Sequence, residues 1–281
     1  MSAHVAIVTD STAYLPQEAL TRHHITVVPL TVILGDEMLE EGTEGSAQTV
    51  ATALRRRRPV TTSRPGPERF TAAYRAAADA GASAVVSLHL SAEFSGTYDA
   101  ACVAAETAPV PVRVVDTGMV AMALGFPVLA AAEAAQSGGT VDDAVAAAEK
   151  RAAGTSAYFY VDTLDYLRRG GRIGAAQALL GSALAVKPLL QLAEGRIQLL
   201  EKVRTASRAI ARLEEVVAER AGQAVVDIAV HHLAAADRAE TLAERLRARV
   251  PGVAELHVSE VGAVIGAHTG PGLLGAVVSP R

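Results

Sequence analysis

The sequence predicts an α/β protein of two domains: an N-terminal domain with a mostly parallel sheet and a C-terminal α+β domain with a mixed or antiparallel sheet. Two observations lead to this prediction. In the first half of the chain, short apolar runs alternate with helical segments, which is typical of a parallel sheet. After Ser156, two apolar runs follow one another directly across Gly195, which is typical of an antiparallel hairpin.

The first half begins with a β–α unit. The apolar run Val5–Thr9 ends in the polar turn Asp10-Ser11-Thr12, and Pro16 is suited to the first turn of the helix that follows. Further strands are expected at 25–34, 84–90 and 112–115. Further helices are expected at 47–58, 67–80, 97–107, 119–136 and 141–153.

The second half contains more strands and fewer helices. Strands are expected at 157–161, 186–192, 196–203, 224–231, 253–261 and 274–278. Helices are expected at 163–169, 206–220 and 236–250. The predicted domains are residues 1–155 and 156–281, with a soft boundary that allows segments to cross from one domain to the other.

Composition restricts the class of protein. With 281 residues, half of them apolar, the chain can bury a large core. The net charge of −4 and the lack of a long basic stripe argue against nucleic-acid binding, and Arg55–Arg58 is simply explained as a solvated helix end. The single cysteine, Cys102, excludes an internal disulfide. Without a signal peptide or an apolar run of about 18–20 residues, we expect a soluble cytoplasmic protein with no integral membrane segment.

The most unusual stretch is Gly262–Gly275, in which glycines surround Pro271 and His268. Its GPGLLG segment matches G-x-G-x-x-G, but the helix and the acidic residue of a dinucleotide site do not follow it. Apolar residues flank the glycines on both sides, so the stretch is expected to be a packed loop rather than a floppy one. A histidine in such a loop is a candidate for polar recognition.

Hydroxyl residues follow several predicted strands, at the edge of a parallel sheet where ligands bind. They occur in Thr9-Asp10-Ser11, in Ser91–Thr97, in Asp116-Thr117 and in the loop Thr61–Ser63. Hydroxyl groups and backbone N–H groups suit a carboxylate or phosphate oxygen. Taken singly, each of these residues is more often a helix cap than a ligand group, but their repetition favours an anion site.

A competing hypothesis is an autonomous serine hydrolase or acyltransferase. In it Ser95 is the nucleophile, His268 the base and Asp116 the orienting acid. The G-x-S-x-G motif of such enzymes is absent around Ser95. No metal site is expected either, because the side chains of the adjacent pairs His23-His24 and His231-His232 diverge.

Six motifs resemble the DegV family of bacterial fatty-acid-binding proteins, and they follow the family's order over nearly the whole chain. They are VAIVTDSTAYLP at 5–16, TTSRPGPERF at 61–70, LSAEFSGTYDAA at 90–101, VVDTGMVAMALG at 114–125, LRRGGRIG at 167–174 and GAVIGAHTGPGLLG at 262–275. Two positions depart from the family's usual residues. Arg64 stands where a smaller polar residue is common, and Thr117 stands where serine is common.

The resemblance implies a lipid-binding protein that is not itself an enzyme. A long-chain fatty acid, similar to palmitate, stearate or oleate, would occupy a buried tunnel between the domains. The resemblance assigns its carboxylate to Thr62, Ser95 and His268. The supporting loop residues would be Ser63, Gly96, Thr97, Gly266, Thr269 and Gly270.

The resemblance also implies a partner. A separate fatty acid kinase, related to dihydroxyacetone kinases, would bring ATP and Mg²⁺ and phosphorylate the bound acid, and the acyl phosphate would enter phospholipid synthesis. Arg168, Arg169 and Arg172 would lie at the docking or transfer surface, although an ordinary solvated turn explains them equally well. No cofactor of the protein's own is expected.

Overall fold

The computed structural model describes residues 4–43, 45–179 and 187–281. These residues form two compact units, each of which contains segments from different parts of the chain. The N-terminal unit comprises Met1–Thr31 and Ser63–Gly154, and the C-terminal unit comprises Val32–Thr62 and Thr155–Arg281. A division into two continuous halves would place Val32–Thr62 in the N-terminal unit instead.

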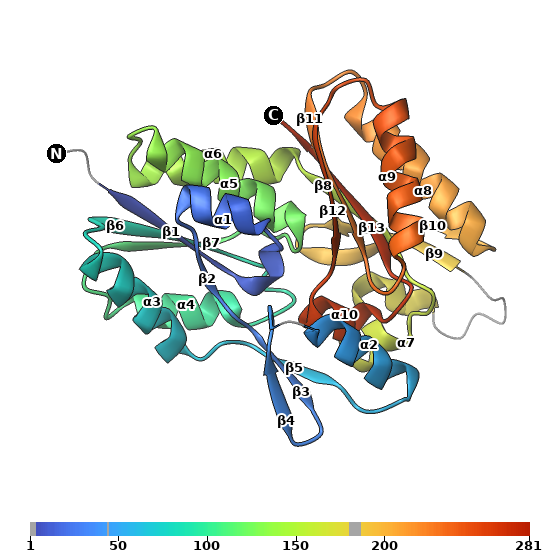
Figure 1. Ribbon diagram of the computed structural model, residues 1–281, viewed down its shortest axis with the longest axis horizontal. Coiled ribbons are helices and arrows are strands. Elements are labelled where there is room, and N and C mark those ends of the chain that lie inside the picture. The colour runs from blue at the N-terminus through green and yellow to red at the C-terminus, as the bar shows by residue number, and fades with distance from the viewer. Residues whose placement is uncertain (1–3, 44, 180–186) are drawn as a thin grey trace. The chain divides into compact units, whose positions relative to one another are not determined.

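The N-terminal unit is built on a parallel sheet, as predicted. Its strand order is β2-β1-β6-β7, with all three pairings parallel. The strands are β1 (Val5–Asp10), β2 (Thr26–Val28), β6 (Ala84–His89) and β7 (Val112–Asp116). The helices are α1 (Gln17–His23), α3 (Pro67–Asp79), α4 (Thr97–Ala105), α5 (Met122–Gln136) and α6 (Val141–Gly154). Helices α3 and α4 cover one face of this sheet and α5 and α6 the other (Figure 1).

The C-terminal unit contains a six-stranded mixed sheet, also as predicted. Its order is β10-β9-β8-β13-β11-β12, and only the pairing of β11 with β12 is parallel. The strands are β8 (Ser156–Tyr160), β9 (Lys187–Ala193), β10 (Arg196–Val203), β11 (Val226–His232), β12 (Val253–Glu260) and β13 (Leu274–Pro280). The helices are α7 (Asp165–Arg169), α8 (Ala206–Ala221), α9 (Ala236–Arg249) and α10 (Ala263–Thr269), with a short 3₁₀ helix at Gly174–Leu179.

The segment between β2 and α3 differs from the prediction. The expected strand at 25–34 is divided in two, because β2 joins the parallel sheet whereas β3 (Thr31–Leu34) belongs to a separate sheet of order β4-β3-β5. That sheet is completed by β4 (Glu37–Glu40) and by β5 (Thr61–Ser63), which forms where we expected only a connecting loop. Helix α2 (Ser46–Arg55) packs against α10 of the same unit.

The expected packed loop at Gly262–Gly275 is largely regular structure. Ala263–Thr269 is helix α10, and β13 begins at Leu274. Two of the glycines between them have positive φ, 75° at Gly270 and 91° at Gly272, so the tight turn that connects the helix to the strand requires glycine. The first residue of the predicted strand 186–192 lies outside the described residues.

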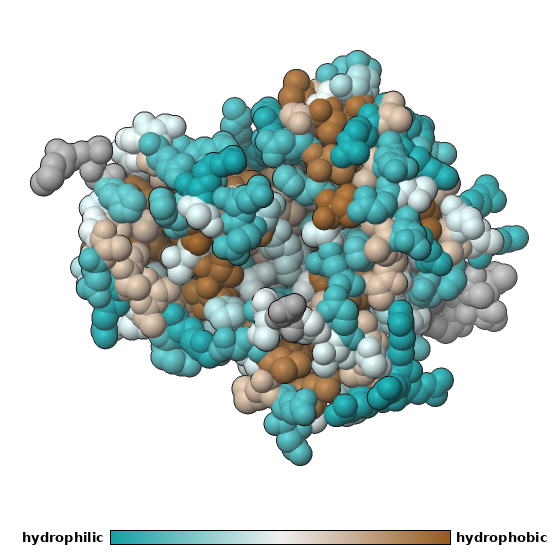
Figure 2. Space-filling model, viewed as in Figure 1, coloured by the Kyte–Doolittle hydropathy of each residue, from teal (hydrophilic) through white to brown (hydrophobic). Residues whose placement is uncertain are grey.

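Most of the surface in view is hydrophilic, and apolar residues show between the charged ones (Figure 2). Among the described residues, no helix has the length and the apolar composition that crossing a membrane requires.

Candidate functional site

Two of the three residues predicted to bind a carboxylate form a hydrogen-bonded pair in the C-terminal unit. Thr62 Oγ1 lies 2.8 Å from Nε2 of His268. Thr62 is the central residue of β5, and His268 is in the last turn of α10. Both residues are half-buried. The structure therefore joins a hydroxyl and an imidazole that are 206 residues apart in the sequence.

Helix α10, which carries His268, is positioned by contacts at its start and along one side. Glu41 is 5% exposed, and its Oε1 accepts a hydrogen bond of 2.9 Å from the backbone N–H of Val264 in the first turn. A methyl group added at Gly266 would lie 3.1 Å from Cδ2 of Leu233. The glycine therefore allows α10 to pack closely, and Glu41 satisfies an N–H that the helix itself cannot.

Gly170 provides the space that the imidazole of His268 occupies. A Cβ atom built at Gly170 would overlap Nδ1 of His268. The backbone of Gly170 has φ of −76°, which any residue can adopt, so the requirement for glycine is one of space. The LRRGGRIG motif and the His268 motif therefore meet at this point, where α7 packs on α10.

The His268 ring is neutral at physiological pH. Burial, followed by the positive charge of Arg172, lowers the pKa of His268 from 6.5 to about 4. Arg172 is held nearby, since its Nη1 donates a hydrogen bond of 2.6 Å to the carbonyl oxygen of Gly170. Nδ1 of His268 is buried and has no hydrogen-bond partner among the described residues. An anion bound here would meet a hydroxyl, a neutral imidazole and a nearby guanidinium.

Arg168 and Arg169, the other two arginines of the motif, are exposed on α7. Arg168 Nη2 lies 3.5 Å from Oδ1 of Asp165 one turn earlier, and each of these side chains is about half exposed. Such a pair contributes little to stability. Both arginines are therefore accessible from solvent.

Ser95, the third predicted carboxylate ligand, lies in the N-terminal unit between β6 and α4. Its Oγ is 2.9 Å from the hydroxyl of Thr97, the buried first residue of α4. The neighbouring Gly96 contacts Arg64, whose Nη1 donates a hydrogen bond of 2.9 Å to the Gly96 carbonyl oxygen. The arginine that departs from the family pattern thus supports the loop that carries Ser95.

Each member of the hypothetical Ser95–His268–Asp116 triad has a different partner from the one that a triad requires. Ser95 pairs with Thr97, and Nε2 of His268 pairs with Thr62. Oδ1 of Asp116 accepts backbone N–H bonds from Gly118 at 2.9 Å and Ala92 at 3.3 Å. Nδ1 of His268, which the acid would orient, has no partner among the described residues.

An Asp–His–Ser arrangement that the sequence analysis missed lies in the core of the N-terminal unit. Oδ2 of Asp10 is 3.0 Å from Nδ1 of His89, and Nε2 of His89 is 2.7 Å from Oγ of Ser87. Ser87 Oγ in turn accepts a hydrogen bond of 2.9 Å from the hydroxyl of Tyr74. All four residues are fully buried, so no substrate reaches this serine, and the chain of hydrogen bonds ties β1, β6 and α3 together.

Most of the predicted supporting residues stabilise their own segments. Thr269 Oγ1 donates to the carbonyl oxygen of Ile265 at 2.9 Å, and Ser63 Oγ donates to that of Arg64 at 3.2 Å. Gly270 caps α10 with positive φ, and a Cβ there would overlap the ring of Tyr166. Across the described ranges, no cluster of three or more His, Cys, Asp or Glu residues could hold a metal ion.

Comparison with known proteins identifies the family to which the chain is similar. The model of the DegV family matches residues 4–281. Among its relatives, the DegV domain-containing protein SCO2569 of Streptomyces coelicolor is 78% identical over 281 residues and is covered completely, as is this chain.

Solved structures agree with the sequence match. A fatty-acid-binding DegV family protein from Thermus thermophilus is 35% identical with a TM-score of 0.93, and the alignment covers 99% of this chain and 100% of that one. DegV of Bacillus subtilis, described as a fatty acid binding protein, is 35% identical with a TM-score of 0.90 and full coverage of both chains. This chain therefore belongs to the DegV family.

Proposed function

We propose that this chain binds a long-chain fatty acid and presents its carboxylate to a separate ATP-dependent fatty acid kinase. The observation that carries the proposal is the Thr62–His268 pair, a hydroxyl and a neutral imidazole beside Arg172. The fatty-acid binding of family members at 35% identity supports the same ligand. Ser95 remains a predicted third ligand.

The pair suits a carboxylate when Nε2 of His268 carries the proton. The imidazole then donates to Thr62 Oγ1, and the Thr62 hydroxyl hydrogen is free to bind a carboxylate oxygen. The negative charge of the ligand would raise the pKa of His268 from its low value in the free protein. Arg172 adds a positive charge on the side of Gly170.

The acyl tail would supply most of the affinity. At about 0.8 kcal/mol per buried CH₂, the roughly 14 methylenes of a palmitate-like tail contribute on the order of 11 kcal/mol before binding costs are subtracted. Such a tail would need an enclosed tunnel, which Ala, Val and Leu side chains would line. Stearate-like and oleate-like acids follow the same argument.

The head group would supply reactivity instead. Hydrogen bonds from neutral donors leave a carboxylate oxygen nucleophilic, whereas a bidentate arginine would occupy both oxygens. The oxygen would attack the γ-phosphorus of ATP, with Mg²⁺ and ATP held by the kinase, and ADP would leave. The resulting acyl phosphate would be used in phospholipid synthesis. Exposed Arg168 and Arg169 would contact the kinase, and Arg172 would lie nearest the transferred group.

Native mass spectrometry of protein purified from bacteria tests the proposal. We expect a mass increment of one C16–C18 fatty acid in the wild type and in His268→Ala. With a fatty acid kinase and ATP, we expect His268→Ala to form acyl phosphate at least about tenfold more slowly, a loss equivalent to one charge-assisted hydrogen bond. His257→Ala, on β12 of the same unit, is the matched control and should behave as the wild type.

Two results would contradict the proposal. An empty wild-type protein that turns over a simple ester would favour the hydrolase with Ser95 and His268. Equal loss of acid and of phosphorylation in His268→Ala would contradict the separate roles of tail and head group.

A further inference from the structure

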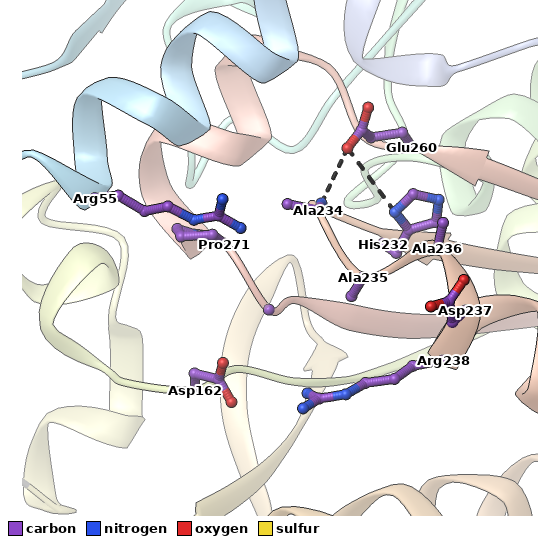
Figure 3. A pocket seen from close by; sticks show the side chains of 11 residues that line it. Arg55, Asp162, His232, Ala234, Ala235, Ala236, Asp237, Arg238, Glu260 and Pro271 are labelled. Carbon is purple, nitrogen blue, oxygen red and sulfur yellow. Dashed lines mark hydrogen bonds and ion pairs between the residues drawn. The ribbon is translucent and has the colours of Figure 1, made fainter.

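A second candidate site lies in the C-terminal unit at the carboxyl ends of the parallel strands β11 and β12. A pocket of about 630 Å³ is formed there by residues that follow β8, β11 and α10 and by Arg55 at the end of α2 (Figure 3). Ligands of α/β proteins bind at this edge of parallel strands, and the volume is that of a small-molecule site. Neither Thr62 nor His268 lines the pocket.

Two arginines extend into the pocket from different elements. Figure 3 shows the guanidinium groups of Arg55, from α2, and Arg238, from the first turn of α9, directed toward its interior. Within the described ranges, neither side chain forms a hydrogen bond or an ion pair. Two guanidinium groups that approach from separate helices form a recognition site for an anion with several oxygens.

The start of α9 adds backbone donors to these cations. The helix follows Ala235, whose methyl side chain cannot accept a hydrogen bond, so the N-cap residue leaves the N–H groups of the first turn uncapped. The N–H groups of this turn have no partners within the helix, and the helix dipole favours negative charge at this end. Ala236, Asp237 and Arg238 all line the pocket.

A buried histidine provides an independent sign of a missing partner. His232, the last residue of β11, lines the pocket and is 8% exposed. Its Nδ1 is buried without a hydrogen-bond partner among the described residues and lies 4.0 Å from Oε1 of Glu260. Buried polar atoms of this kind normally have a partner.

Three carboxylates also line the pocket, and two of them have protein partners. Glu260 accepts from the N–H of Ala234 at 2.9 Å and from Nε2 of Gln48 at 2.5 Å. Asp162 accepts from the hydroxyl of Tyr160 at 2.6 Å. Of the charged side chains that line the pocket, Arg55, Arg238 and Asp237 have no hydrogen bond or ion pair within the described ranges.

We propose that this pocket binds a phosphate monoester. The phosphate lies between Arg55, Arg238 and the first turn of α9. Two guanidinium groups and backbone N–H groups offer more donors than the two oxygens of a carboxylate need, which suits the several oxygens of a phosphate. Asp237 and His232 are left as partners for hydroxyl groups on the rest of the molecule. This inference does not depend on the proposed fatty-acid function.

Isothermal titration calorimetry with glycerol 3-phosphate and with inorganic phosphate tests the site, with glycerol as the probe that lacks a phosphate. We expect one saturable site for glycerol 3-phosphate and none for glycerol. Arg55→Ala and Arg238→Ala should each weaken binding by about tenfold, as expected for one charge-assisted contact. Arg56→Ala, a neighbouring exposed arginine that does not line the pocket, should leave the affinity unchanged.

Asp237→Asn is expected to change the affinity for glycerol 3-phosphate in the opposite direction. Removal of this negative charge should tighten the binding of glycerol 3-phosphate, which a variant that merely damaged the fold would not do. Shifts in the amide NMR signals of residues 234–238 should accompany binding.

Three outcomes would overturn the proposal. They are the absence of saturable binding, the same loss in Arg56→Ala as in Arg55→Ala, and inorganic phosphate binding more tightly than glycerol 3-phosphate, which would reduce the site to a free-phosphate site. The fatty-acid content of Arg55→Ala should equal that of the wild type, so a failure here leaves the fatty-acid proposal untouched.

Discussion

Ser87 lies between Tyr74 and His89, and the three side chains determine where the imidazole carries its proton. The Tyr74 hydroxyl donates to Ser87 Oγ, so the single Ser87 hydrogen is available for Nε2 of His89. Nδ1 therefore carries the ring proton and donates to Asp10. Burial raises the pKa of Tyr74 to about 12, so the tyrosine keeps the proton on which this order depends.

Ser87→Ala should destabilise the N-terminal unit by about 1–3 kcal/mol, because His89 loses its donor and Tyr74 loses its nearest acceptor, both in a buried setting. Urea unfolding would measure the loss. Ser83→Ala, an exposed serine whose hydroxyl donates to the carbonyl oxygen of His4, should cost much less. Nitrogen-15 NMR of His89 should show the ring proton on Nδ1, and the opposite tautomer, with the proton on Nε2, would contradict the proposed order.

Thr62 and His268 were both assigned to the carboxylate through the resemblance of their motifs to the DegV family, and the structure adds the hydrogen bond between them. Gly170 and Glu41 were missed for physical reasons. Gly170 contributes only empty space beside Nδ1 of His268. Glu41 caps the first turn of α10 through the N–H of Val264, which lies 223 residues later in the sequence. Neither role leaves a local pattern in the chain.

At the scale of elements, the contact between α7 and α10 depends on Gly170. Gly170→Ala should displace the His268 ring and destabilise the C-terminal unit by about 1–3 kcal/mol, the usual cost of overpacking. The His268 ring signals in NMR would report the displacement, and urea unfolding the loss of stability.

Gly171→Ala is the matched control for Gly170→Ala, because it strains the backbone instead of overlapping a neighbouring side chain. Gly171 has φ of 70° and open space around its Cβ position, so alanine there strains the backbone without touching His268. It should lower stability but leave the His268 signals in place. Unchanged His268 signals in Gly170→Ala would show that the ring does not depend on this glycine.

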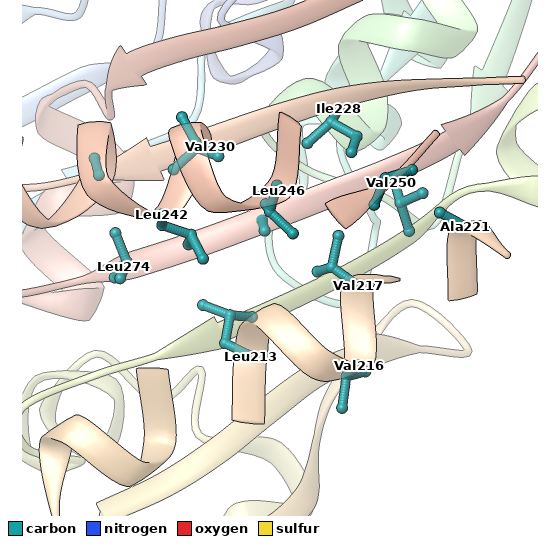
Figure 4. Close-up of a cluster of buried hydrophobic side chains, with 14 of the residues drawn as sticks. Leu213, Val216, Val217, Ala221, Ile228, Val230, Leu242, Leu246, Val250 and Leu274 are labelled. Carbon is teal, nitrogen blue, oxygen red and sulfur yellow. The ribbon is translucent and has the colours of Figure 1, made fainter. Parts of the chain in front are cut away.

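The amphipathic helices were the elements most easily predicted from the sequence. Figure 4 shows Leu213, Val216 and Val217 of α8, with Leu242 and Leu246 of α9, gathered in one cluster with residues of β11 and β13. Their spacing of three and four residues is a local property, so the sequence reveals it. Helix α10 was expected as a loop because glycine is a poor helix former. Contacts with Glu41 and Leu233, distant in the sequence, stabilise it instead.

At the scale of the whole molecule, the lowered pKa values of His231 and His268 make stability depend on pH. The pKa of His231 is lowered to about 4 by burial and then by His232, and the pKa of His268 to about 4 by burial and then by Arg172. In the unfolded chain both have the ordinary value of 6.5. Between these two values the unfolded state binds protons that the folded state does not. Stability is therefore full above pH 6.5 and falls as the pH drops toward 4.

Each histidine should cost about 2 kcal/mol of stability between pH 7 and pH 5 in protein freed of lipid, from the size of its pKa shift. Urea unfolding at the two pH values would measure this loss. His268→Gln cannot titrate at this position, so it should lose only the part of the stability that depends on His231, which is about half of the combined loss. A variant as sensitive to pH as the wild type would mean that His268 is not held neutral. If the carboxylate binds at His268 as proposed, its negative charge would raise the pKa of His268. Loading the wild type with palmitate should then reduce its sensitivity to pH, whereas His268→Gln should show no such change. A loaded wild type that kept the full pH sensitivity would place the carboxylate away from His268.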